Sequence, residues 1–111
     1  GAYQPIGHVS ILTNIIDFGM NVQQAGDAIR WNHSGSTQPT DDLSESLNDD
    51  GLVAIESSIN YQIVRDLEAR GHDVKIGDSF FGRFQAIMRD PLTGIYYGAS
   101  ESRVDGQAAG Y

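Results

Sequence analysis

Histidines and paired carboxylates are the side chains of this 111-residue sequence whose types could support acid–base or metal chemistry. His8, His33 and His72 stand far apart, and none has a second histidine at the three- or four-residue spacing of a helical metal site. A metal site is therefore not expected. We interpret His8 and His72 as hydrogen-bonding residues near the ends of helices.

The paired carboxylates lie in one polar stretch, from Ser34 to Asp50, which holds five acidic residues and no basic one. Asp41-Asp42 and Asp49-Asp50 could suggest general acid–base work or calcium binding. However, the stretch lacks the apolar and aromatic walls that shift a pKa or enclose an ion. It is predicted to be a flexible acidic loop, residues 34–50.

Motifs for nucleophiles and cofactors are absent from the sequence. A nucleophile elbow needs Gly-x-Ser-x-Gly, and the nearest approach, His33 to Ser36, has the wrong spacing. The chain has no cysteine, no phosphate-binding loop and no dinucleotide fingerprint. No cofactor is predicted, and no self-contained catalytic constellation is present.

Composition and charge limit the classes of partner. A formal net charge of −8 disfavours a phosphate backbone, so no nucleic-acid partner is expected. No apolar run approaches the roughly 20 residues of a membrane helix, so no membrane partner is expected either. Because the chain starts at Gly1 rather than Met, we expect that an upstream part has been removed, and an export signal there stays open.

Hydrophobic spacing predicts two helices at the start of the chain. Apolar residues at three- and four-residue spacing from Pro5 to Phe18 predict a helix with one buried face, and Gly19 suits its end. Asn21 followed by Gln24 resembles a capping box, which starts a second helix ending near Arg30. The two helices should form a hairpin.

The second half of the chain alternates predicted strands and a helix. Leu52–Ile55 is predicted to be a strand, followed by a helix through Ile63 that ends at Gly71, and by a strand at Val74 and Ile76. Phe84–Arg89 and Ile95–Ser100 flank a turn at residues 90–94 and predict a β-hairpin. Phe84, Ala86 and Met88 should form its drier face.

These elements predict an α+β fold, in which helices pack on a largely antiparallel sheet. The sheet is small for its number of strand signals, so further strands should come from a parent protein or from another copy, because an open edge risks aggregation.

Several blocks resemble the end of the small subunit of gamma-glutamyltransferases and together span nearly the whole chain. They read GAYQPIGH (1–8), NIIDFGM (14–20), QAGDAIR (24–30), LEARGH (67–72) and ESRVDGQAAGY (101–111). The resemblance implies a C-terminal fragment, residues 1–111, of an N-terminal nucleophile hydrolase with an αββα sandwich. Its partners would be the upstream large subunit, the start of the small subunit, and a γ-glutamyl small-molecule substrate.

In that family a proenzyme cleaves itself, and the threonine thereby exposed becomes the nucleophile of γ-glutamyl transfer or hydrolysis. The resemblance places this threonine upstream, so Thr13, Thr37, Thr40 and Thr93 are not assigned as nucleophiles. The isolated chain should therefore be inactive. Many members of the family are exported to the periplasm or beyond the cell, although a cytoplasmic location also stays open.

One catalytic position is implied within the chain. Gly1 falls where the family has the second glycine of a pair whose backbone N–H groups form the oxyanion hole. Arg103, Asp105 and Gly106 match the closing motif, and we expect a structural role: the guanidinium pairs with a carboxylate and the glycine permits a turn.

Three hypotheses stay open at this point. In the first, the parent protein acts on γ-glutamyl amides. In the second, it is a related acylase for another amide, such as an acylated antibiotic side chain or a cyclic peptide-like substrate. Alternatively, the chain is a noncatalytic interaction module that binds a partner or dimerises through its sheet edge. A threonine at an upstream self-cleavage site would favour the first two.

Overall fold

The structure, a computed structural model, describes residues 3–35, 51–77 and 81–110. The chain divides into two compact units. Unit 1 combines residues 1–28 with 81–111, and unit 2 comprises residues 29–80. Gly1 and residues 36–50 of the predicted acidic loop lie outside the described residues.

Unit 1 begins with the two predicted helices. Helix α1 (Gln4–Ile16) has Pro5 in its first turn, and Gly19 follows its end with a φ of +65°. Helix α2 (Val22–Asp27) starts with the predicted capping box: Asn21 Oδ1 accepts from Gln24 N at 2.8 Å, and Gln24 Oε1 accepts from Asn21 N at 3.0 Å. These expectations are confirmed.

The end of the second helix was predicted wrongly. α2 ends at Asp27 rather than near Arg30, because Ala28 is extended, with φ −56° and ψ 149°. The following residues form a strand instead. At its start, Arg30 N donates to Glu56 Oε2 at 2.9 Å, and Glu56 N donates to Arg30 O at 3.1 Å. This pairing between distant residues outweighs the local helical pattern.

The predicted hairpin is present as β4 (Gln85–Arg89) and β5 (Tyr96–Ser100), which pair antiparallel with Ala86 opposite Ala99. In its turn, Asp90 Oδ1 accepts from Leu92 N at 2.7 Å and from Thr93 N at 3.1 Å. The Thr93 and Leu92 amides lower the pKa of the Asp90 carboxyl.

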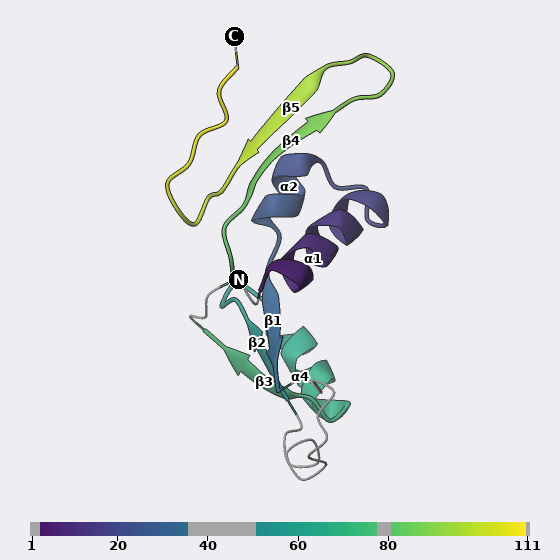
Figure 1. Cartoon of the computed structure of the whole chain (residues 1–111). Coiled ribbons are helices and arrows are strands. Elements are labelled where there is room, and N and C mark those ends of the chain that lie inside the picture. The colour runs from purple at the N-terminus through teal and green to yellow at the C-terminus, as the bar shows by residue number, and fades with distance from the viewer. Residues whose placement is uncertain (1–2, 36–50, 78–80, 111) are drawn as a thin grey trace, which may run out of the picture. The chain divides into compact units, whose positions relative to one another are not determined.

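The drier face of the hairpin covers the core of unit 1, as predicted. Phe84 is buried, Ala86 and Met88 are half-buried, and Ile87 on the other face is exposed. Phe84 joins Val22 and Ala99 in one cluster, against which Ile11 also packs. Figure 1 shows α1 and α2 on one side of this hairpin.

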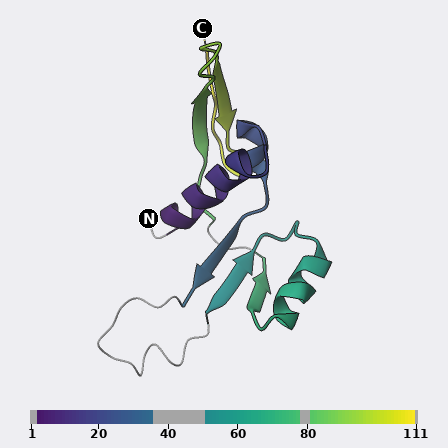
Figure 2. The same ribbon diagram turned by 90° about the vertical axis from the view of Figure 1, so that its right-hand side faces the viewer.

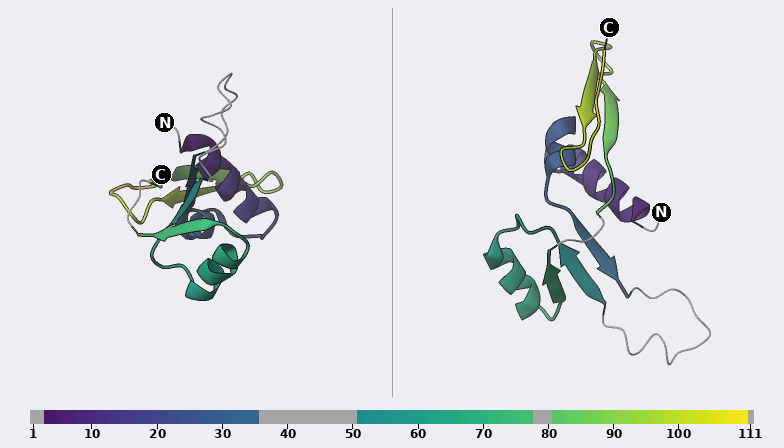
Figure 3. Two further views of the ribbon diagram at one scale, coloured as in Figure 1. Left: turned by 90° about the horizontal axis from the view of Figure 1, so that it is seen from below. Right: turned by 90° about the vertical axis from the view of Figure 1, so that its left-hand side faces the viewer.

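Unit 2 contains a three-stranded sheet in the order β1-β2-β3 with one helix. β1 (Trp31–Ser34) pairs antiparallel with β2 (Leu52–Ile55), which pairs parallel with β3 (Asp73–Ile76). Helix α4 (Tyr61–Ala69) connects β2 to β3, and it lies close to β3 in Figures 2 and 3. β2, α4 and β3 are as predicted, whereas β1 was not predicted.

The prediction of one buried face on α1 was wrong for three of its apolar residues. Val9, Leu12 and Ile16 are 65%, 55% and 73% exposed, whereas Ile6 and Ile15 are half-buried. Unit 1 therefore covers one side of α1 and leaves a second apolar stripe in solvent. In the described part of the chain, no helix combines the length and apolarity needed to cross a membrane.

Candidate functional site

The described residues nearest in sequence to Gly1 form the start of α1. This helix has 13 residues, and its first turn contains no acidic side chain. The positive end of its dipole and its first N–H groups are thus not neutralised by carboxylates of that turn. A helix start of this kind favours developing negative charge nearby.

Tyr3 anchors the start of α1. Its ring meets that of Phe81 edge-on, with centroids 6.4 Å apart and an interplanar angle of 83°. Gly7 and Gly82 both lie against this ring, since an added Cβ would come within 2.8 Å of Tyr3 Cε1 at Gly7 and 2.6 Å of Cδ1 at Gly82. Segment 81–82 thereby fixes the residue two positions after Gly1.

Arg103 binds the carboxyl end of α2. Its Nη1 donates to Gly26 O at 3.0 Å, and its Nη2 donates to Asp27 O at 3.3 Å and to Ala28 O at 3.0 Å. The last carbonyls of a helix have no partner within it, and a cation stabilises that end of the helix dipole. Arg103 therefore caps α2 from a distant part of the chain.

Glu101 completes this arrangement. Its side chain is fully buried, and Oε1 accepts from Arg103 Nη1 at 3.1 Å and from Arg103 N at 3.2 Å. Oε2 accepts from Phe84 N at 2.9 Å. The expected pairing of Arg103 with a carboxylate is confirmed, and its partner is the first residue of the same motif. These hydrogen bonds offset the cost of burying the carboxylate.

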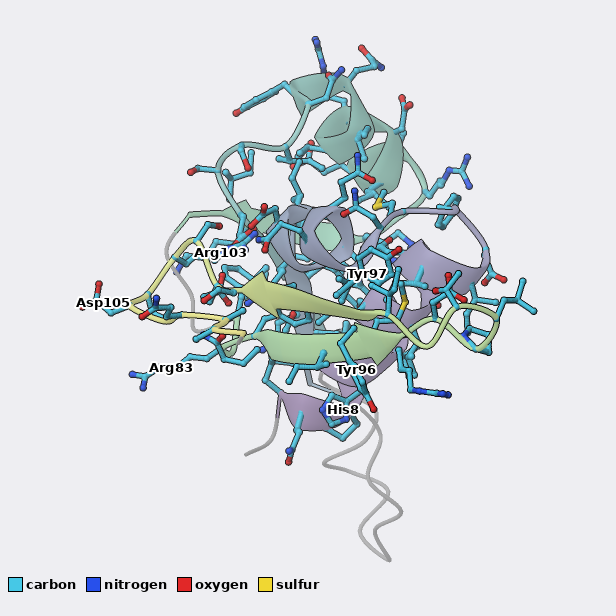
Figure 4. The ribbon with its side chains drawn as sticks, turned by 90° about the horizontal axis from the view of Figure 1, so that it is seen from above. His8, Arg83, Tyr96, Tyr97, Arg103 and Asp105 are labelled. Atoms are coloured by element: carbon cyan, nitrogen blue, oxygen red, sulfur yellow. The ribbon has the colours of Figure 1, made fainter. Side chains whose placement is uncertain are left out.

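The other two residues of the closing motif behave differently. Asp105 is exposed and points outward from the loop, whereas Arg103 lies next to the helix (Figure 4). The chain bends at residues 102–104, and Gly106 itself is not among the glycines with positive φ, so it does not use the left-handed backbone that favours glycine. It is a close-packing position, where an added Cβ would clash with the Gln85 amide.

A second link joins α2 to the hairpin. Gln23 Nε2 donates to Ser100 O at 2.8 Å, and Gln23 Oε1 accepts from Ser100 N at 3.0 Å. The side-chain amide thus pairs with the backbone of β5 as a neighbouring strand would. Neither this link nor the roles of Tyr3 and Glu101 were predicted, although Tyr3 and Glu101 lie within the recognised sequence blocks.

Those of the remaining candidate residues that the structure describes do not form a reactive group. His8 on α1 and His72 before β3 are exposed, and His33 lies on β1. Within residues 3–35, 51–77 and 81–110, no three His, Asp or Glu side chains come together to hold a metal. Thr13 lies on α1 and Thr93 in the β4–β5 turn, while the paired aspartates, Thr37 and Thr40 lie outside the described residues.

Unit 1 also contains an open hollow of about 800 Å³ between the hairpin and the C-terminal segment. Residues 107–110 line one side, and Gln85, Ile87, Tyr96 and Gly98 line the other. Tyr96 and Tyr97 project to opposite sides of the hairpin (Figure 4). Among the described residues that line it, none has a carboxylate, imidazole or ammonium group, so these side chains offer no acid–base pair for catalysis.

Comparison with known proteins identifies the family. The model of the family described as Gamma-glutamyltranspeptidase matches residues 1–111. The chain belongs to this family. The glutathione hydrolase proenzyme of Escherichia coli (strain K12) is 33% identical over 104 residues, which is 93% of this chain and 15% of that protein.

Solved structures agree with the family and confirm the predicted fold class. Cephalosporin acylase from Bacillus halodurans is 38% identical over 100% of this chain and 18% of its own, with a TM-score of 0.80. The gamma-glutamyltranspeptidase from Pseudomonas nitroreducens shares the fold at 18% identity, with a TM-score of 0.73 over 96% of this chain and 49% of its own. The chain thus has the mixed helix and largely antiparallel sheet of N-terminal nucleophile hydrolases.

Proposed function

We propose that this chain forms the C-terminal part of the small subunit of an enzyme that transfers or hydrolyses γ-glutamyl groups. The observation that carries the proposal is the family match over residues 1–111, together with 33% identity to a glutathione hydrolase proenzyme. The chain spans only 15% of the length of that relative. The nucleophile and the groups that bind the substrate then belong to the upstream part.

The proposed reaction has two steps. The upstream threonine Oγ attacks the γ-carbonyl carbon of the substrate, its proton passes to the threonine α-amine, and the leaving amine takes up that proton. Water or an acceptor amine then attacks the resulting ester and releases the glutamyl group. Both tetrahedral intermediates place negative charge on the former carbonyl oxygen, which needs N–H donors nearby.

Gly1 is the proposed donor from this chain. Its support is the family motif and its place in the sequence three residues before the first residue of α1, a helix whose first turn contains no acidic side chain and so favours negative charge nearby. Replacing Gly1 by proline in the full-length protein removes the N–H, whereas Gly1→Ala keeps it. We expect Gly1→Pro to lower kcat by about 10²- to 10³-fold, as for other oxyanion-hole donors. Equal kcat values for the two variants would remove Gly1 from the site.

The proposed partner is the upstream part of the same proenzyme. The exposed stripe of Val9, Leu12 and Ile16 on α1 supports this, because apolar residues at helical spacing usually pack against another element. The sheet edges in unit 2 leave association with a second copy as an alternative.

A related acylase is the second candidate, favoured by 38% identity to a cephalosporin acylase. A panel of amides separates the two functions. The full-length protein is assayed with a γ-glutamyl anilide and with a cephalosporin that carries an amide-linked acyl side chain. A higher kcat/KM for the γ-glutamyl anilide than for the cephalosporin supports the proposal. A higher kcat/KM for the cephalosporin contradicts it and supports the acylase instead. No hydrolysis of either, with no N-terminal threonine after processing, would favour the noncatalytic module.

A further inference from the structure

Glu101 and Arg103 connect three separate segments of unit 1. Arg103 holds the carbonyls at the end of α2, while Glu101 accepts from the amide of Phe84. We call Glu101, Arg103 and their hydrogen bonds to Gly26, Asp27, Ala28 and Phe84 the C-terminal latch. Its two side chains are joined at 3.1 Å, so α2, the start of β4 and the C-terminal motif are fixed together.

The latch continues toward the start of α1. Phe84 lies only two residues after Gly82 and three after Phe81, which are the residues that hold the ring of Tyr3. The Phe84 ring also lies directly against Gly26 of α2, so it has little freedom to move. A displacement of the Phe84 amide would therefore be transmitted through a short, closely packed segment to Tyr3.

We propose that Glu101 and Arg103 are positioning residues, which act through Phe84, segment 81–82 and Tyr3 on the beginning of α1. This inference rests on the proposed function, since Gly1 is two residues before Tyr3 and is the proposed oxyanion donor. Neither latch residue is proposed to contact the substrate. Their proposed contribution is to hold Tyr3 and the start of α1, the described residues that follow Gly1 in the sequence, so that the transition state is stabilised by preorganised groups.

The geometry accounts for an arginine at position 103. Two different nitrogens of one planar guanidinium reach three carbonyls and one carboxylate oxygen. A lysine ammonium keeps the positive charge but is a single point donor that cannot span these acceptors. Arg103→Lys therefore tests geometry while it preserves charge, and it avoids leaving the buried Glu101 carboxylate without a cation.

The experiment compares Arg103→Lys, Glu101→Gln and the control Arg83→Lys in the full-length protein. Arg83 is exposed, precedes Phe84 directly and points away from the molecule (Figure 4). We expect both latch variants to lower kcat for the γ-glutamyl anilide by about 10- to 100-fold with KM within about twofold, because the donor acts in the transition state. The control should retain wild-type kcat.

Active-site titration with a covalent inhibitor separates positioning from loss of folded protein. A fall in kcat per titrated site supports the inference, whereas a fall in the number of sites at unchanged kcat per site overturns it. Unchanged kinetics in both latch variants would also overturn it.

Hydrogen exchange gives a readout independent of activity. Gly7 N donates to Tyr3 O at 3.0 Å in the first turn of α1. We expect faster exchange of the Gly7 and Phe84 amides in Arg103→Lys, and unchanged exchange in Arg83→Lys. If the wild type lacks γ-glutamyl activity, the proposed function fails, and the hydrogen-exchange comparison alone then tests the link from the latch to α1. Unchanged exchange of the Gly7 amide in Arg103→Lys would overturn that link.

Discussion

Gly26 offers the sharpest test of how unit 1 packs. It lies near the end of α2, where an added Cβ would overlap Cε1 and Cδ1 of the Phe84 ring. The ring belongs to the buried cluster, and the amide of the same residue is bound to Glu101. Phe84 therefore cannot give way easily, and Gly26→Ala should destabilise this region.

Two opposing effects set the magnitude. Alanine is favoured over glycine in a helix interior by about 0.8–1.0 kcal/mol. Overpacking of a core costs about 1–3 kcal/mol, and the direct overlap with an aromatic ring places Gly26→Ala toward the upper end. The net expectation is a loss of about 2 kcal/mol, which corresponds to about 30-fold faster opening.

Hydrogen exchange of the α2 amides in the full-length protein measures this loss. Gly110→Ala is the control, because no described residue lies within 4 Å of an added Cβ there and its φ is not positive. Combining Gly26→Ala with Phe84→Leu should recover part of the loss, since the two sites are in contact. Slower or unchanged α2 exchange in Gly26→Ala would refute the reasoning, because helix propensity would then outweigh the clash.

Three further predictions concern the ends and surfaces of elements. The pKa of the Asp90 carboxyl should lie below its ordinary value of 3.8, because the Thr93 and Leu92 amides stabilise the charged form. The contribution of Asp90 to stability is therefore present above pH 3.8 and is lost as the pH falls through the lowered pKa. Carbon-detected NMR titration checks this, and Asp90→Asn should abolish that acid dependence of turn exchange. Asn21→Ala should cost about 1 kcal/mol and speed α2 exchange about fivefold, and equal rates would show that the capping box is dispensable. Leu12→Asp should reduce assembly of the processed subunits on size-exclusion chromatography, whereas Leu92→Asp in the exposed turn should not; equal assembly would exclude α1 as the docking face.

Local patterns in the sequence predicted most elements because their signals lie within a few residues. The capping box of Asn21 and Gln24 and the turn at Asp90 each depend on contacts across two or three positions. Such contacts form wherever the local backbone permits them. Both therefore appear in the structure as the sequence indicates.

Long-range contacts account for what sequence reasoning missed. β1 depends on pairing with β2 across more than 15 residues, and only the alternation of Trp31 and His33 with polar neighbours could have indicated it. The C-terminal latch likewise joins Arg103 to carbonyls 75 to 77 positions away. Periodicity carries no information about such partners. The exposure of Leu12 could not be predicted because its pattern says only that the face is apolar.

The most direct test of the central claim is hydrolysis of a chromogenic γ-glutamyl anilide by the full-length gene product and by this 111-residue chain alone. We predict activity in the full-length protein and none in the isolated chain, since removing the nucleophile of a catalytic unit removes nearly all of its effect. Hydrolysis by the isolated chain would contradict an upstream nucleophile. No hydrolysis by a correctly processed full-length protein would contradict γ-glutamyl chemistry.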